Sequence, residues 1–225
     1  IADQLEECGS ASAYPQGKVL ADAARLSMNK LSEEYPSLSG YYPAPKQLTL
    51  LSRAFSGMGV SGIYSPFTVE ANINGEMPDM EKPFTSCHEL SHLRGYMNEG
   101  EANYIGWLAC IESDDPSFNR SGWLIAWVYA GGTMRRVDPV RYEKLREQRY
   151  KEAVKSYDPA ALIGIIKATY LRNQKRLEQG KKNTLIDERY FKMAEHNLYA
   201  ELAFAMNKDE SEICQIITDN IHMKV

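Results

Sequence analysis

Two histidines four residues apart, His88 and His92, constrain this sequence more than any other feature. Residues at this spacing project from one face of an α-helix, about one turn apart. A helix through the segment therefore brings both imidazoles to a single point. Glu89 directly follows the first histidine and completes the motif His-Glu-x-x-His. The segment predicts a helix that carries two nitrogen ligands and a neighbouring carboxylate.

This combination of side chains is suited to zinc chemistry. Neutral imidazole nitrogen is a good zinc ligand, and a catalytic zinc site has three protein ligands and one open position for water. A carboxylate at position 89 is placed to take a proton from that water and to deliver it later to a leaving group. We therefore expect His88 and His92 to bind Zn²⁺ and Glu89 to act as the general base.

The third ligand must come from another segment, and Glu99 and Glu101 are the candidates. The helix expected from about residue 98 to 113 has a face of small residues that would let it pack closely on the motif helix: Ala102, Gly106, Ala109 and Cys110. Glu99 lies in phase with this face, whereas Glu101 lies in phase with a bulkier one. Asn103 follows Glu99 by one turn and could hydrogen-bond a ligand histidine. These arguments favour Glu99 and leave Glu101 as the alternative.

The remaining pattern predicts an α+β fold that is mostly α, in a single domain over residues 1–225 that is helical from about 138. Residues 67–74 alternate apolar and polar side chains, which predicts an edge strand that begins after Pro66. The motif helix should start after a cap at Thr85 or Ser86 and end at Gly95. Residues 48–55 fit either a strand or a short helix. Further helices are expected at about 18–34, 122–136, 138–156, 158–178 and 187–206.

Composition excludes several classes of protein. The net charge of −4 argues against a nucleic-acid-binding protein. The four cysteines show no Cys-x-x-Cys spacing, and Cys87 and Cys110 are expected to be buried free thiols. The apolar run 123–130 is too short to span a bilayer and predicts a buried core helix. His196 and His222 are expected on the surface, outside the metal site.

The motif and the residues that follow it resemble the gluzincin metallopeptidases. In thermolysin-like enzymes and in CAAX-processing membrane proteases, a glutamate followed four residues later by an acid or amide supplies the third ligand, which maps onto Glu99 and Asn103. The spacing departs from that pattern, because only six residues separate His92 from Glu99. The glycine turn at Gly95 is similar to that of metzincins, which carry a histidine or aspartate where this chain has Asn98.

Residues 15–150 also resemble an uncharacterised bacterial family of membrane-anchored proteins with this zinc motif. The segments that carry the resemblance are 42–46, 62–67, 70–74, 83–85, 88–95, 99–104 and 121–122, whereas the last 40 or so residues do not fit it. Members have transmembrane helices ahead of this domain. Because the chain begins with Ile1, the resemblance implies a preceding membrane anchor and a domain outside the cytoplasm. It implies a chemistry and no particular substrate.

We therefore expect a zinc metallopeptidase that acts on a peptide or protein held extended along residues 67–73. One alternative is a sensor or structural domain that keeps the metal without catalysis, and another is a zinc amidase that acts on a cell-wall component. A donor for the oxyanion is also expected. The sequence does not choose among the candidates near the motif: Tyr64, Arg94, Tyr96, Tyr104 and Tyr129.

Overall fold

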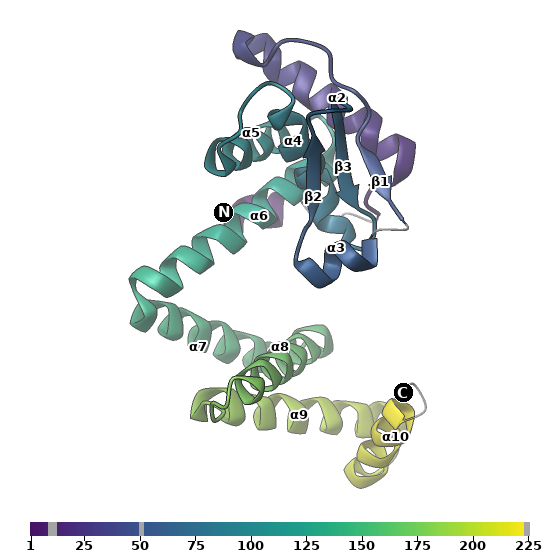
Figure 1. Cartoon of the computed structure of the whole chain (residues 1–225). Helices are drawn as coiled ribbons and strands as arrows, with labels where there is room; N and C mark the ends of the chain where they lie inside the picture. The colour runs from purple at the N-terminus through teal and green to yellow at the C-terminus, as the bar shows by residue number, and fades with distance from the viewer. Residues whose placement is uncertain (9–12, 50–51, 223–225) are drawn as a thin grey trace. The chain divides into compact units, whose positions relative to one another are not determined.

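A computed structural model describes residues 1–8, 13–49 and 52–222 (Figure 1). The chain divides into two compact units, residues 1–133 and residues 134–225. The structure confirms an α+β fold that is mostly helical, with one small sheet in its described part. The histidine motif lies in the first unit. Whether the two units fold as a single domain stays a prediction.

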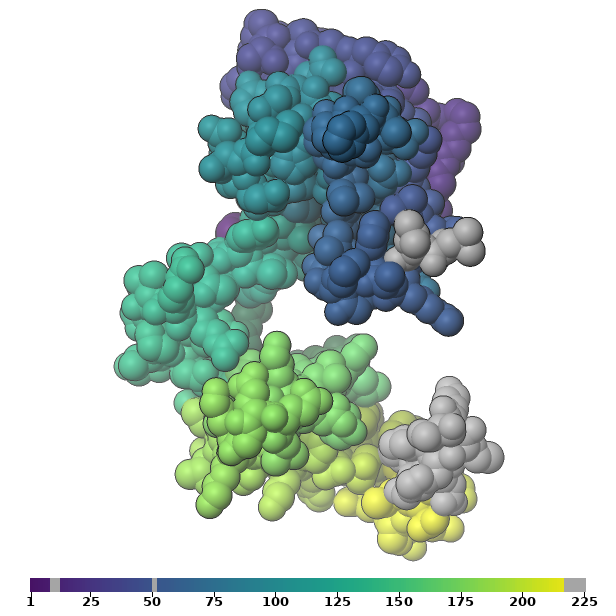
Figure 2. Space-filling view, viewed as in Figure 1, coloured from purple at the N-terminus to yellow at the C-terminus, as the bar shows by residue number. Residues whose placement is uncertain are grey.

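The sheet of the first unit has three strands in the order β1-β3-β2. Strand β3 (Glu70–Asn74) pairs in parallel with β1 (Lys46–Leu48) and antiparallel with β2 (Gly62–Ser65). The predicted edge strand at 67–74 is therefore wrong in two respects: β3 is the central strand, and it begins at residue 70. Residues 66–69 form a turn instead, in which Val69 has a φ of +54° and Phe67 is 97% exposed. This turn lies at the surface, in dark blue near the top of Figure 2.

Burial explains why the alternation was misleading. Asn72 and Asn74 are buried along with Ala71 and Ile73, so β3 has no solvated polar face. The Asn74 amide nitrogen donates to Ser56 Oγ at 2.9 Å and to the Val60 carbonyl at 3.2 Å. A polar side chain in a central strand is tolerated when tertiary partners satisfy it in this way. Those partners come from outside the strand, so its own alternation could not reveal them.

Three helices form the part of the first unit that contains the motif. Helix α4 (Lys82–His92) carries it, and all eleven of its residues are buried. Helix α2 (Gly17–Glu34) and helix α5 (Glu99–Ile111) contribute to the same hydrophobic core as α4 and β3. That core is formed by buried side chains such as Leu20, Met28, Ile73, Phe84, Leu90 and Phe118. A helix buried along its whole length is held rigidly, so its side chains are fixed in place.

Helix α4 begins earlier than predicted. Thr85 and Ser86 lie inside it, and the Ser86 hydroxyl donates to the Lys82 carbonyl at 2.8 Å. Pro83 occupies the first turn, where a residue without an N–H is well tolerated, and a 3-10 turn (η2, Asp79–Glu81) leads into it. The predicted cap is therefore wrong. The end is close to the prediction, with a turn at 93–95 in which Gly95 has a φ of +89°.

The other elements of the first unit are α1 (Ala2–Glu7), η1 (Pro36–Leu38), α3 (Ser52–Met58) and most of α6 (Pro116–Val137). The ambiguous segment 48–55 contains both the end of β1 and the start of α3, and its residues 50–51 lie outside the described part. Helix α6 begins at Pro116, six residues before the prediction, where Asp115 Oδ1 accepts from the Ser117 N–H at 2.8 Å. The prediction that the run 123–130 is a buried core helix is wrong: residues 123–126 are only partly buried, and Trp127, Val128 and Tyr129 are about half exposed.

The second unit is helical in its described residues. It contains α7 (Pro139–Ser156), α8 (Pro159–Glu178), α9 (Leu185–Met206) and α10 (Glu210–His222). The first three agree with the predicted helices to within two residues, because Asp138, Asp158 and Thr184 cap them. Helices α1 and α10 were not predicted. Buried Tyr150, Leu162 and Tyr190 belong to the core of this unit.

Two predictions from composition are confirmed, and one finding concerns membranes. The cysteines are free, and Cys87 and Cys110 are buried. His196 is exposed, with Nδ1 3.4 Å from a Glu210 carboxylate oxygen, while the side chain of His222 lies outside the described part. Across the described residues, no helix is long and apolar enough to cross a membrane.

Candidate metal centre

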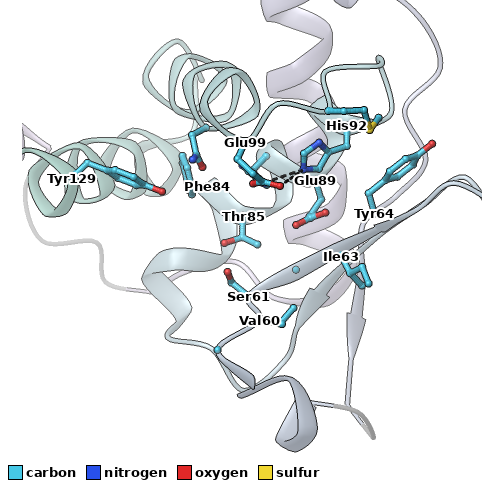
Figure 3. A pocket seen from close by; sticks show the side chains of 15 residues that line it. Val60, Ser61, Ile63, Tyr64, Phe84, Thr85, Glu89, His92, Glu99 and Tyr129 are labelled. Carbon is cyan, nitrogen blue, oxygen red and sulfur yellow. Dashed lines mark hydrogen bonds and ion pairs between the residues drawn. The ribbon is translucent and has the colours of Figure 1, made fainter. Parts of the chain in front are cut away.

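The two histidines of α4 converge as the motif predicts (Figure 3). Their Nε2 atoms are 3.2 Å apart, and the rings meet edge to face with centroids 4.8 Å apart. Burial lowers the pKa of His88, and the neighbouring His92 lowers it further, so the neutral ring that a metal needs is favoured. The charge of Glu99 and a contact with the Asn103 side chain act in the opposite direction.

Glu99, and not Glu101, joins the histidines. Its carboxylate oxygens lie 3.3 Å from His88 Nε2 and 3.8 Å from His92 Nε2. Glu101 is exposed on another side of α5. Asn98 fixes this register, because its side chain caps α5 by accepting from the N–H groups of Gly100 and Glu101. The cap makes Glu99 the first residue of the helix, on the face turned toward α4.

The small-residue face of α5 packs on α4, as its composition predicts. A Cβ atom added to Gly106 would lie 2.9 Å from the backbone nitrogen of His88 and 3.1 Å from its Cα. Ala102 and Ala109 on the same face are fully buried. The backbones of the two helices thus approach closely at His88, the first candidate ligand. Glu99 lies two helical turns before Gly106, so this contact helps to set the position of Glu99.

Glu89 lies on the strand side of α4, against β2. A Cβ atom on Gly62 would lie 2.4 Å from Glu89 Oε1 and 2.8 Å from its Cδ, so only glycine leaves room for this carboxyl group. Burial, and then the charge of Glu99, raise the pKa of Glu89 to about 8. Its Oε2 is buried without a hydrogen-bond partner among the described residues. A divalent cation beside it would favour the ionised form again.

Behind the histidines lie the predicted Asn103 and one partner that was not predicted, the backbone carbonyl of Tyr96. His92 Nδ1 lies 2.7 Å from the backbone carbonyl of Tyr96, to which a protonated Nδ1 donates. The remaining lone pair of His92 is then on Nε2, where a metal would be. Asn103 does interact with the His88 ring, although His88 Nδ1 itself has no hydrogen-bond partner in the described part. The Tyr96 carbonyl could not be predicted, because every residue has a backbone carbonyl and the sequence does not show which one contacts a ligand histidine.

The turn after α4 is held by Arg94. Its guanidinium donates to the carbonyls of Ser39 at 3.3 Å and Tyr41 at 2.9 Å, and lies 5.0 Å from the centroid of the Tyr42 ring. The Tyr96 hydroxyl donates to Ser37 Oγ at 2.9 Å. The segment 37–42 therefore anchors the turn that carries the Tyr96 carbonyl.

A cleft of about 480 Å³ opens over the metal-site residues. Its lining comes from β2 and the residues before it, from α4, from the start of α5 and from α6: Gly59–Tyr64, Phe84, Thr85, His88, Glu89, His92, Met97, Glu99, Asn103 and Tyr129. Among the five candidates for an oxyanion donor, only Tyr64 and Tyr129 line it. Tyr64 has its ring 6.2 Å from that of His92.

The donor set fits a divalent cation of the zinc type. Ligand atoms about 2.05 Å from a tetrahedral zinc lie roughly 3.3 Å from one another. The separations of 3.2 Å between the two Nε2 atoms and 3.3 Å between His88 Nε2 and Glu99 Oε2 match this value, and the 3.8 Å between His92 Nε2 and Glu99 Oε1 is longer. Two unprotonated ring nitrogens that face each other so closely repel unless a cation or a proton lies between them. The group of His88, His92 and Glu99 offers one ligand atom each, within 4.8 Å of one another.

Comparison with known proteins identifies a family and no activity. The family described as "Protein of unknown function (DUF3810)" matches residues 2–180. This range contains the whole first unit and extends through α7 and α8, so residues 181–225 lie outside it. No curated protein and no solved structure matches the chain.

Proposed function

The chain belongs to this family of unknown function, DUF3810, and we propose that it is a zinc-dependent metallopeptidase. The observation that carries the proposal is the convergence of the His88, His92 and Glu99 ligand atoms beside a buried Glu89 in an open cleft. A structural zinc site would close its fourth position with another protein ligand. No fourth histidine, cysteine or acid joins this group among the described residues.

The proposed chemistry divides between the metal and the protein. Zinc, when bound by His88, His92 and Glu99, would supply the positive charge that activates a water molecule and polarises a carbonyl group. Glu89 takes the proton of that water and passes it to the leaving nitrogen. The Tyr96 carbonyl keeps the lone pair of His92 on Nε2. The resulting arrangement of α4, α5 and an edge strand supports a zincin-like fold.

The strand order moves the expected peptide-binding position from residues 67–73 to strand β2. Strand β3 is paired on both sides, so a substrate cannot add to it along residues 67–73. Both β1 and β2 are edge strands, and the β2 edge is the one at the cleft, which Gly62, Ile63 and Tyr64 line. The Asn74 N–H donates to the Ser61 carbonyl at 2.8 Å, and antiparallel pairing alternates along a strand. The N–H and C=O groups of Gly62 and Tyr64 therefore face away from β3, where an extended peptide can pair with them.

Two measurements test the proposal together. Metal analysis of the purified chain should give one zinc per molecule, and a library of peptides should contain sequences that the protein cleaves. Glu89→Gln should keep the zinc and lower the cleavage rate by roughly 10²- to 10⁴-fold, the usual contribution of a general base. Full activity in Glu89→Gln, or a chain without stoichiometric zinc, would refute the proposal.

Two other functions are compatible with the same set of candidate ligands. A non-catalytic zinc domain would bind the metal and leave every library peptide intact. A zinc amidase would cleave cell-wall fragments in preference to peptides. The free edge of β2 beside the cleft favours a substrate with a peptide backbone, since it offers main-chain groups in the register of a strand.

A further inference from the structure

We infer that the cleft acts on internal bonds of an extended polypeptide, as an endopeptidase, and selects against acidic side chains beside the bond. This inference rests on the proposed function and concerns its substrate. The observations behind it are the charged side chains in and around the cleft and the residues of this chain that already bind them.

A free C-terminus would meet no lysine or arginine among the described residues that line the cleft. Apart from Tyr129, the lining residues lie between positions 59 and 103, and this range contains two basic residues, Lys82 and Arg94, neither of which lines the cleft. The Lys82 ammonium is buried and donates to Asp79 Oδ1 at 2.7 Å and Gln16 Oε1 at 2.8 Å. The Arg94 guanidinium is bound by the loop at 39–42. A substrate carboxylate would lose its hydration in the cleft without a compensating ion pair, so a carboxypeptidase does not fit.

A free N-terminus has no spare carboxylate either. The cleft lining contains two acids, Glu89 and Glu99. Glu99 points its oxygens at the two histidines, and Glu89 is buried with the role of general base. Neither is available for a substrate ammonium group, and Glu101 does not line the cleft. An aminopeptidase therefore does not fit.

The lining extends to both sides of the two glutamates, as a chain that continues in both directions requires. Figure 3 draws Tyr129 and Tyr64 on opposite sides of Glu99 and Glu89, and both tyrosines belong to the lining. Neutral side chains lie between them, including Val60, Ile63 and Phe84. Substrate side chains beside the bond would thus meet a lining with two carboxylates and no lysine or arginine, which disfavours aspartate and glutamate at these positions.

Capped peptides test the inference on the zinc-loaded full chain. A decapeptide that the protein cleaves is prepared with free ends, with an acetylated N-terminus, with an amidated C-terminus and with both caps. We expect the same internal bond to be cut in all four, with kcat/KM values within about threefold of one another, because neither terminus contributes binding energy. Loss of single residues from one end, abolished by the cap at that end, would overturn the inference while leaving the peptidase proposal intact. If no library peptide is cleaved, the peptidase proposal itself fails, and this inference fails with it.

A charge substitution tests selection by side chain. Replacing a glutamine next to the scissile bond by glutamate should lower kcat/KM about fivefold or more in the unaltered protein. Ser61→Arg adds a cation at the cleft wall and should recover up to about fivefold for the glutamate peptide, the range of an exposed ion pair. Ser61→Gln, of similar length and neutral, is the control and should recover nothing. Equal cleavage of the two peptides by the unaltered protein would overturn selection against acids.

Discussion

Replacing Gly106 by alanine tests whether the contact between α4 and α5 sets the metal site. The added Cβ would lie 2.9–3.2 Å from backbone and Cβ atoms of His88, whereas relaxed contacts lie near 3.5–4.0 Å. The helices must separate there by roughly 0.5 Å, and α4 is buried along its whole length. Overpacking of this kind costs about 1–3 kcal/mol, and the higher helix propensity of alanine returns about 1 kcal/mol.

Gly132→Ala is the matched control. Gly132 also lies within a helix of the first unit, but nothing lies within 4 Å of its added Cβ. This variant gains only the propensity term. Comparing the two variants therefore cancels that term, and Gly106→Ala should be less stable than Gly132→Ala by about 1–3 kcal/mol in urea unfolding.

Gly106→Ala should also lower the affinity of the chain for zinc. Metal–ligand distances tolerate about 0.2 Å, which is less than the expected displacement between the helix of Glu99 and that of the histidines. Competition with a chromophoric chelator should show that zinc affinity falls about tenfold or more in Gly106→Ala and not in Gly132→Ala. Equal stability of the two variants would refute the close packing at Gly106. Lower stability with unchanged zinc affinity would show that Glu99 reaches the metal without support from this contact.

Three further predictions address the base, the third ligand and the metal. Gly62→Ala should lower peptide cleavage by roughly 10- to 100-fold without loss of zinc, because its Cβ displaces the Glu89 side chain rather than backbone, whereas Gly57→Ala, with open space around its Cβ, should not change cleavage. Glu99→Gln should weaken zinc binding on the order of 100-fold and Glu101→Gln should leave it unchanged, so equal losses in the titration would contradict the assignment. Zinc at 100 times its Kd should stabilise the apo chain by about 2.7 kcal/mol, seen as a higher melting temperature that Glu99→Gln lacks at the same concentration.

Local patterns in the sequence were sufficient for one half of the site. The spacing of His88 and His92 fixes their common face on any helix, so their convergence follows from the motif alone. Glu99 could be chosen because it is in phase with Gly106, and the structure places Gly106 against His88. Helices α7 and α8 of the second unit were predictable for a similar reason, since their caps and prolines are local signals.

Tertiary contacts determine the other half, and sequence patterns do not record them. The contact of Gly62 with Glu89 joins residues 27 positions apart on different elements, and nothing near Gly62 marks it as the neighbour of a buried acid. The strand prediction was wrong because alternation at 67–74 fits a solvated edge as well as a buried centre. The difference depends on Ser56 and the Val60 carbonyl, which satisfy Asn74 from outside the strand.

In the proposed mechanism, metal binding and hydrolysis depend on different contacts of the same helix, α4. Gly106 brings α5 and its Glu99 to the histidines, whereas Gly62 lets β2 lie against Glu89. A substitution on the β2 side can therefore abolish hydrolysis and leave the ligands in place, and such a protein would be a non-catalytic zinc domain. Zinc stoichiometry alone consequently does not separate the peptidase from its main alternative. The decisive comparison is between the unaltered chain and Glu89→Gln at equal zinc content, because only a peptidase loses a measurable rate.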